Sequence, residues 1–116
     1  MGTSSAVGEP NIAYIGSWWW EDDETILVVD NFFRKTRSNV EENPRVSLLA
    51  WSKDQRKSYQ MKCSATVMTN GPQYEKAFKK ERSRKDFRYP CKAVVLLRVK
   101  EVYQSWFGEG AGDKVL

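Results

Sequence analysis

The sequence predicts a mostly β protein with two short helices that closes into a small barrel. Five segments rich in β-branched and other apolar residues are separated by turns, and two polar segments have helical spacing. Their order is strand, strand, helix, strand, strand, helix, strand. A mostly antiparallel sheet of this size usually closes, because open edges invite aggregation. With 116 residues, the chain suits one domain, residues 1–116, with a single core.

The first half of the chain predicts a hairpin followed by a helix. Residues 11–20 (NIAYIGSWWW) form a strand that runs into the acidic turn 21–24, and residues 25–30 (TILVVD) form the return strand. The turn lacks the alternating ligand spacing of a calcium loop, so we interpret it as a solvated turn and not as a metal site. A short helix follows over residues 34–42, and the Asn43-Pro44 pair ends it.

The second half predicts further strands and one amphipathic helix. Residues 45–51 (RVSLLAW) form a strand that is too apolar for one whole face to be solvated. Residues 59–69 alternate with period two, which places Cys63 on the apolar face as a small core residue. Residues 73–85 form a helix whose far side is basic, and residues 93–103 form an apolar strand typical of a central, two-sided position.

The composition excludes several kinds of chemistry. The chain has no histidine, which rules out Ser/His/Asp and Cys/His nucleophilic catalysis. Its two cysteines form no CxxC pair, which argues against a zinc site or a disulfide-stapled scaffold and favours a reduced, cytoplasmic setting. No segment is long and apolar enough to span a membrane. The net charge of +4 permits an anionic ligand but does not require nucleic acid.

The candidate binding site is Arg34-Lys35-Thr36, at the start of the first predicted helix. There, free backbone N–H groups, the positive end of the helix dipole, two cations and a hydroxyl group can converge on one phosphate. The alternative is that the two cations pair with Glu41, Glu42 or the acidic turn, as on any surface helix. The apolar strand that leads into this point would provide a flat wall for a ring system.

Three stretches carry a resemblance to a known family. They are GEPNIAYIGSWWW, ETILVVDNFFRKTRSNVEENPRVSLLAW and YQMKCSATVMTNGPQYEKAF, in this order. Over residues 3–104 the chain resembles the pyridoxamine 5'-phosphate oxidase-related FMN-binding proteins, and the ordered set RKT, NVEENPRVSLL and NGPQYE is the most specific part. The resemblance implies a split β-barrel that forms a homodimer and holds FMN in clefts at the subunit interface.

Family roles, carried over by position, imply a set of cofactor-binding residues. Arg34, Lys35 and Thr36 would bind the FMN phosphate. The first predicted hairpin would line the ribityl chain and ring with Ile15, Gly16 and Ser17, and would present backbone groups of Val28, Val29, Asp30 and Asn31 to the polar edge of the isoalloxazine. Gln60 and Lys62 would reach the flavin from the polar face of a later strand, and Tyr89 aligns with an aromatic residue that crosses from the partner subunit onto the ring.

The resemblance predicts a redox protein in which FMN transfers hydride or electrons and no side chain acts as a catalyst. The N-terminal helix of the family is missing, and so is the C-terminal Arg/His set with which the true oxidases hold their vitamin phosphate substrate. Aromatic surface, including Trp106 and Phe107 in the Gly-rich tail, independently favours a homodimer. Two alternatives remain: a deazaflavin-binding or flavin reductase variant of the same fold, and a basic module that binds nucleic acid.

Overall fold

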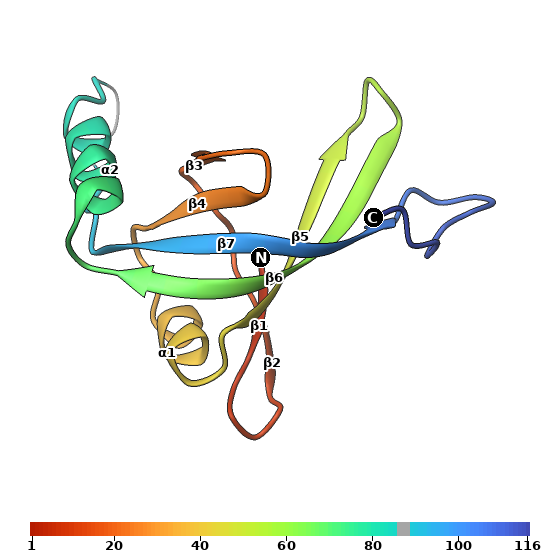
Figure 1. The fold of residues 1–116 in the computed structure, drawn as a ribbon, viewed down its shortest axis with the longest axis horizontal. Helices are drawn as coiled ribbons and strands as arrows, with labels where there is room; N and C mark the ends of the chain where they lie inside the picture. The colour runs from red at the N-terminus through yellow and green to blue at the C-terminus, as the bar shows by residue number, and fades with distance from the viewer. Residues whose placement is uncertain (86–88) are drawn as a thin grey trace.

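The structure is a computed structural model that describes residues 1–85 and 89–116. Its described strands form one seven-stranded antiparallel sheet in the order β2-β1-β5-β6-β7-β4-β3 (Figure 1). The helices α1 (Lys35–Glu42) and α2 (Pro72–Arg82) lie on opposite sides of this sheet. The strands are β1 (Gly2–Ser4), β2 (Pro10–Ile12), β3 (Trp18–Trp20), β4 (Thr25–Asp30), β5 (Arg45–Ser52), β6 (Lys57–Met68) and β7 (Ala93–Gln104). The predicted mostly β architecture with two short helices is confirmed.

Strands β4 and β7 form the centre of the core because both carry apolar residues on both faces. In β4, Ile26 and Val28 belong to one buried cluster, whereas Leu27 and Val29 belong to the other. Strand β7 divides its apolar residues between the two clusters in the same way. Helix α1 contributes to the first cluster and α2 to the second, each through its buried apolar side. The prediction of a two-sided strand over residues 93–103 is therefore confirmed.

The segment predicted as one strand over residues 11–20 is instead two short strands. Strand β2 pairs with β1, a strand that was not predicted, whereas β3 pairs with β4 and confirms the predicted hairpin. Residues 13–17 between them are irregular and include Gly16, a residue that weakens strands. Because so short a connection spans at most about 20 Å and joins the two edge strands, the sheet must curl until its edges approach each other.

Two apolar segments are less covered than the sequence predicts. Leu49 and Trp51 of β5 are 63% and 66% exposed, so the expectation that this strand has no solvated face is wrong for the chain alone. In the C-terminal tail, Trp106 stacks on Phe107 with ring centroids 5.2 Å apart, yet Phe107 remains exposed. The end of the tail folds back along β7, where the Val102 N–H donates to the Leu116 carbonyl at 2.8 Å.

Candidate functional site

A groove of about 560 Å³ opens beside the start of α1. Residues 11–14 and Gly16 form one wall, residues 31–36 form the other, and Val29 and Tyr89 complete the lining. The first wall runs from the end of β2 into the connection between the two edge strands, and the second runs from the end of β4 into the start of α1. The groove therefore lies where the curled sheet brings distant parts of the chain together.

The start of α1 offers unused hydrogen-bond donors to this groove. Arg34 occupies the N-cap position, but no side chain caps the helix and its first turn contains no acidic residue. The backbone N–H groups at the helix start and the positive end of its dipole are thus available to an anion. Arg34, Lys35 and Thr36 all line the groove, as the sequence predicts for a shared site. We call these three residues the phosphate site, after the ligand that the sequence predicts for them.

The alternative in which the cations of the phosphate site pair with nearby carboxylates is not observed. Within residues 1–85 and 89–116, neither Arg34 nor Lys35 has a carboxylate oxygen within 4.0 Å. Glu41 pairs with Arg37 at 2.5 Å instead. The acidic turn pairs elsewhere, since Glu24 contacts Arg98 at 2.8 Å and Glu21 lies 3.7 Å from Lys76. Both cations of the phosphate site are exposed and remain available.

The hydroxyl group of Thr36 is held by a residue that the sequence analysis did not identify. Asn11 Nδ2 donates to Thr36 Oγ1 at 2.9 Å and to Thr3 Oγ1 at 3.1 Å. Because the Thr36 oxygen accepts this bond, its own hydrogen is free to donate into the groove. Thr36 is otherwise buried. An asparagine within a β-rich segment, where this residue is unfavourable, was the one signal in the sequence that could have pointed to Asn11.

Part of the backbone at the end of β4 is hydrogen-bonded within the chain. Val28 is fully buried in the core, whereas Val29 lines the groove and donates its N–H to the Ser17 carbonyl at 3.0 Å. The Asp30 carbonyl accepts the Lys92 N–H at 3.0 Å. Asn31 lines the groove, and its Nδ2 donates to the Pro90 carbonyl at 2.9 Å.

The other predicted flavin contacts do not all lie at the groove. Of residues 15–17, only Gly16 lines the groove: Ile15 packs against the first core cluster, and the buried Ser17 Oγ accepts from Arg84 at 3.1 Å. Tyr89 lines the groove of its own chain and meets Phe32 edge to face, with ring centroids 5.6 Å apart.

Gln60 and Lys62 do not line the groove of their own chain. They lie on the face of β6 that also carries Leu49 and Trp51 across the pairing with β5. Lys62 Nζ donates to Ser47 Oγ at 2.8 Å on this same face. We call this surface the outer face; it is the place where exposed apolar side chains and the predicted Gln60 and Lys62 occur together.

The two cysteines of the chain are buried thiols that are not prepared for nucleophilic chemistry. Burial raises the pKa of the Cys63 thiol to about 11, and burial together with the nearby Glu81 and Asp30 carboxylates raises that of Cys91 to about 11. Both thiols therefore stay protonated near neutral pH, which matches the prediction of Cys63 as a core residue. Among the residues that the structure describes, no group of three His, Cys, Asp or Glu side chains could hold a metal ion. Neither described helix is long and apolar enough to cross a membrane.

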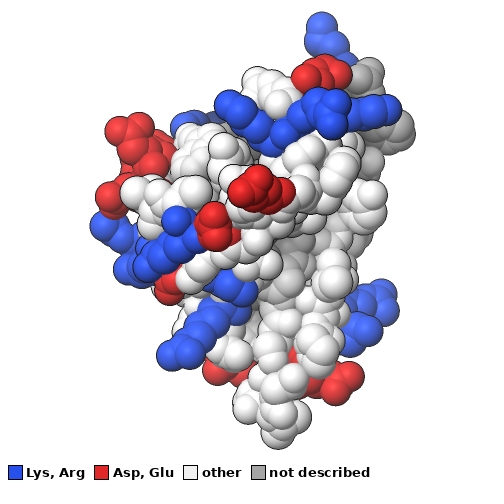
Figure 2. All heavy atoms as spheres, turned by 90° about the vertical axis from the view of Figure 1, so that its right-hand side faces the viewer, with Lys and Arg blue, Asp and Glu red and all other residues white. Residues whose placement is uncertain are grey.

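The basic side chains of α2 are largely occupied by aromatic rings of the same chain. Lys80 lies 4.2 Å from the centroid of the Trp19 ring, and the Arg82 guanidinium lies 5.4 Å from that of Phe78. Figure 2 shows the side of the molecule opposite α2, where a row of basic side chains crosses the upper part and acidic side chains lie beside the basic ones. The cation–π contacts of α2 and this mixture of charges on the opposite side do not single out a surface for nucleic acid.

The curled antiparallel sheet, with one helix on each side, defines the protein as a split β-barrel, the class that was predicted. The chain belongs to the pyridoxamine 5'-phosphate oxidase family, because the family model described as "Pyridoxamine 5'-phosphate oxidase" matches residues 1–106. The uncharacterized protein MJ0282 of Methanocaldococcus jannaschii is 33% identical over 118 residues, which cover 99% of this chain and 77% of that protein. The predicted family is confirmed.

Solved structures agree with the fold. HupZ of Group A Streptococcus is similar with a TM-score of 0.79 and 29% identity, over 96% of this chain and 86% of that chain. An FMN-binding protein from Syntrophomonas wolfei subsp. wolfei has a TM-score of 0.74 and 17% identity, over 93% of this chain and 76% of that chain. The second similarity shows a shared fold at low sequence identity.

Proposed function

We propose that the protein is a homodimeric, cytoplasmic flavoprotein that binds FMN non-covalently and takes part in redox reactions through it. The observation that carries this proposal is the phosphate site: a helix start without a side-chain cap, two cations with no carboxylate partner among the described residues, and a hydroxyl donor, all at one groove. Family membership and the shared fold with an FMN-binding protein support the choice of ligand. When bound, FMN would supply hydride or electron transfer.

The residues of the groove fit a flavin phosphate. The groove volume of about 560 Å³ lies within the range of small-molecule sites, roughly 300–1,000 Å³. Arg34 and Lys35 would neutralise the phosphate charge, and the Thr36 hydroxyl would donate to one phosphate oxygen. The free N–H groups at the start of α1 would donate to the others. No side chain caps the start of α1, and the Thr36 oxygen accepts from Asn11, which leaves the hydroxyl hydrogen available to the phosphate.

Apolar and aromatic residues of the same groove would orient the ring. Val29 and Phe32 lie along the wall that leads from β4 to α1, and Tyr89 contacts Phe32 at its edge. These side chains would exclude water from one part of the flavin and hold its plane. The chain has no histidine, and burial keeps both thiols protonated near neutral pH, so the role that we propose for its residues is to bind and orient the flavin.

A second copy of the chain would complete the site. Gln60 and Lys62 lie on the outer face, away from the groove of their own chain, so they can contact the flavin only across a subunit interface. The same face exposes Leu49 and Trp51, whose apolar surface a homodimer would cover. The homodimer and the flavin contacts of Gln60 and Lys62 therefore belong to one proposal.

The test is to identify the cofactor of the purified protein. We expect flavin absorbance and release of FMN, identified by mass spectrometry, on denaturation. Protein purified without cofactor should take up added FMN in equal amount to the chain. Colourless protein that also fails to bind added FMN would refute the proposal, and release of a deazaflavin would replace FMN by that cofactor in the same groove.

A further inference from the structure

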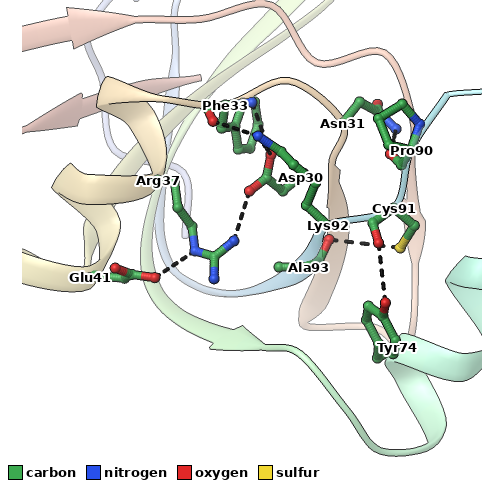
Figure 3. A network of polar contacts seen from close by, with 10 residues as sticks. All are labelled: Asp30, Asn31, Phe33, Arg37, Glu41, Tyr74, Pro90, Cys91, Lys92 and Ala93. Atoms are coloured by element: carbon green, nitrogen blue, oxygen red, sulfur yellow. Dashed lines mark hydrogen bonds and ion pairs between the residues drawn. The ribbon is translucent and has the colours of Figure 1, made fainter.

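Asp30 carries a fully buried negative charge four residues before the first cation of the phosphate site. Its carboxylate is 0% exposed and accepts the Phe33 backbone N–H at 2.9 Å (Figure 3). Arg37 Nη1 donates to its other oxygen at 3.0 Å, and Lys92 Nζ lies 3.6 Å from the first. Two cations and one N–H group thus compensate the cost of burying this charge.

Lys92 holds the same turn from the opposite side. Its Nζ donates to the Phe33 carbonyl at 2.8 Å, so both backbone polar groups of Phe33 are bound, one by Asp30 and one by Lys92. The backbone of Lys92 also bonds to the Asp30 carbonyl, and Asn31 bonds to Pro90. These contacts join the turn after β4 to the segment that begins at Tyr89, although 59 residues separate Phe33 from Lys92.

The position of Asp30, close to the start of α1, indicates a role other than stabilising the fold. A buried ion pair is often no more stabilising than an apolar replacement, and the rest of β4 is apolar from Ile26 to Val29. Phe33 directly precedes Arg34, the N-cap of α1. The Phe33 N–H and the Phe33 carbonyl belong to the two peptide groups that flank this residue. Holding both groups therefore fixes the direction in which α1 starts, and with it the direction of the free N–H groups. Arg37, bound by Asp30, adds a second contact one turn into the helix.

We propose that Asp30 and Lys92 are positioning residues for the phosphate site. They hold Phe33 so that the start of α1, with Arg34 and Lys35, faces the groove, and they tie this side of the groove to the side that carries Tyr89. Neither charged group lines the groove itself, so their effect passes through Phe33. This inference rests on the proposed function, and it assigns the Asp30 side chain a role distinct from the backbone contact that the resemblance implies.

Two substitutions test the inference with a ligand pair that isolates the phosphate. Asp30→Asn keeps the shape and the acceptor for the Phe33 N–H but removes the charge that holds Arg37 and Lys92. Lys92→Gln removes the cation from a partly exposed side chain and should fold in any case. Riboflavin has the ring and ribityl chain of FMN without its phosphate. We expect each variant to raise the Kd for FMN about tenfold and to leave that for riboflavin within about twofold.

Glu41→Gln provides the matched control, because it removes the exposed partner of Arg37 and leaves Asp30 in place. Both Kd values, measured by flavin fluorescence titration, should stay within about twofold of the unmodified protein. Equal losses of affinity for FMN and riboflavin would show that Asp30 and Lys92 merely support the whole groove. Unchanged FMN affinity in Lys92→Gln would show that Lys92 does not act on the phosphate site. Either result overturns the inference. Failure of the unmodified protein to bind FMN overturns the proposed function, and this inference with it, before any variant is compared.

Discussion

Replacing Arg34 and Lys35 together by alanine is the most direct perturbation of the phosphate site. Both side chains are exposed and neither has a carboxylate partner among the described residues, so the substitution removes no interaction of the folded chain itself. Helix α1 keeps its buried contacts through Thr36, Asn39 and Val40. The free energy of unfolding should therefore change by less than about 0.5 kcal/mol.

The effect on FMN binding follows from the contacts that the two cations can make. A hydrogen bond to a charged group contributes about 1.5–3 kcal/mol when it is shielded from water. Arg34 and Lys35 are exposed, so solvent screening reduces each contact to about 1–2 kcal/mol. Together they account for about 3 kcal/mol, which corresponds to a Kd roughly 100-fold higher. Backbone donors and Thr36 remain, so binding should weaken without being abolished.

The assay is a titration of cofactor-free protein with FMN, followed by quenching of flavin fluorescence at low and high salt. Lys53→Ala combined with Lys79→Ala is the matched control, since it removes the same charge from two exposed positions outside the groove. The control should bind FMN like the unmodified protein. A loss below about threefold in the Arg34 and Lys35 variant, or an equal loss in the control, would show that the phosphate lies elsewhere.

Four further predictions test other parts of the structure. Thr36→Val removes the hydroxyl donor that Asn11 orients, so the Kd for FMN should rise about tenfold in the same titration, and an unchanged Kd would exclude this contact. Trp51→Glu places a charge on the outer face and should convert a dimer into a monomer in analytical ultracentrifugation; an unchanged mass would move the interface elsewhere. Leu97→Ala empties a fully buried position of the first cluster and should lower the free energy of unfolding by about 3 kcal/mol in urea titrations, whereas a loss below about 1 kcal/mol would contradict tight packing there. Burial raises the pKa of Cys63 and Cys91 from 9.0 to about 11, so their alkylation at pH 8 should be slow until the chain unfolds. The free energy of unfolding should fall between pH 9 and 11, because the thiols of the unfolded chain ionise first. Rapid alkylation of the native protein would contradict this prediction.

Local chemistry explains which parts of the fold were predictable. The limits of α1 were predicted closely because an Asn-Pro pair ends the helix and polar residues of helical spacing fill it. The helix predicted over residues 73–85 ends earlier, at Arg82, with Ser83 as its C-cap; beyond it, Arg84 donates to Ser17 Oγ, a contact that no local pattern shows. The prediction of one strand over residues 11–20 is wrong, because Gly16 and the pairing of β2 with β1 outweigh the aromatic and β-branched composition of this segment.

The candidate site was predictable only where its residues are neighbours in sequence. Arg34, Lys35 and Thr36 meet at one helix start, so their convergence in the groove follows from helix geometry. Asn11 reaches Thr36 across 25 residues, a contact that no local pattern shows. The prediction that Gln60 and Lys62 touch the flavin stays a prediction, because it depends on a second copy of the chain.

The sequence by itself determined the kinds of element and the presence of a helix start with two cations and a hydroxyl group, because periodicity and turn residues act over a few residues. The tertiary structure alone decided what faces that helix start. The curl of the sheet brings the segment after β2 against α1, and the pairing of β4 with β7 brings Lys92 to Asp30 and Phe33. Such contacts depend on the closure of the whole sheet, so no local sequence pattern shows them. The resemblance implied Asp30 only as a backbone contact, whereas in the structure its buried side chain binds Phe33 and Arg37 at the start of α1.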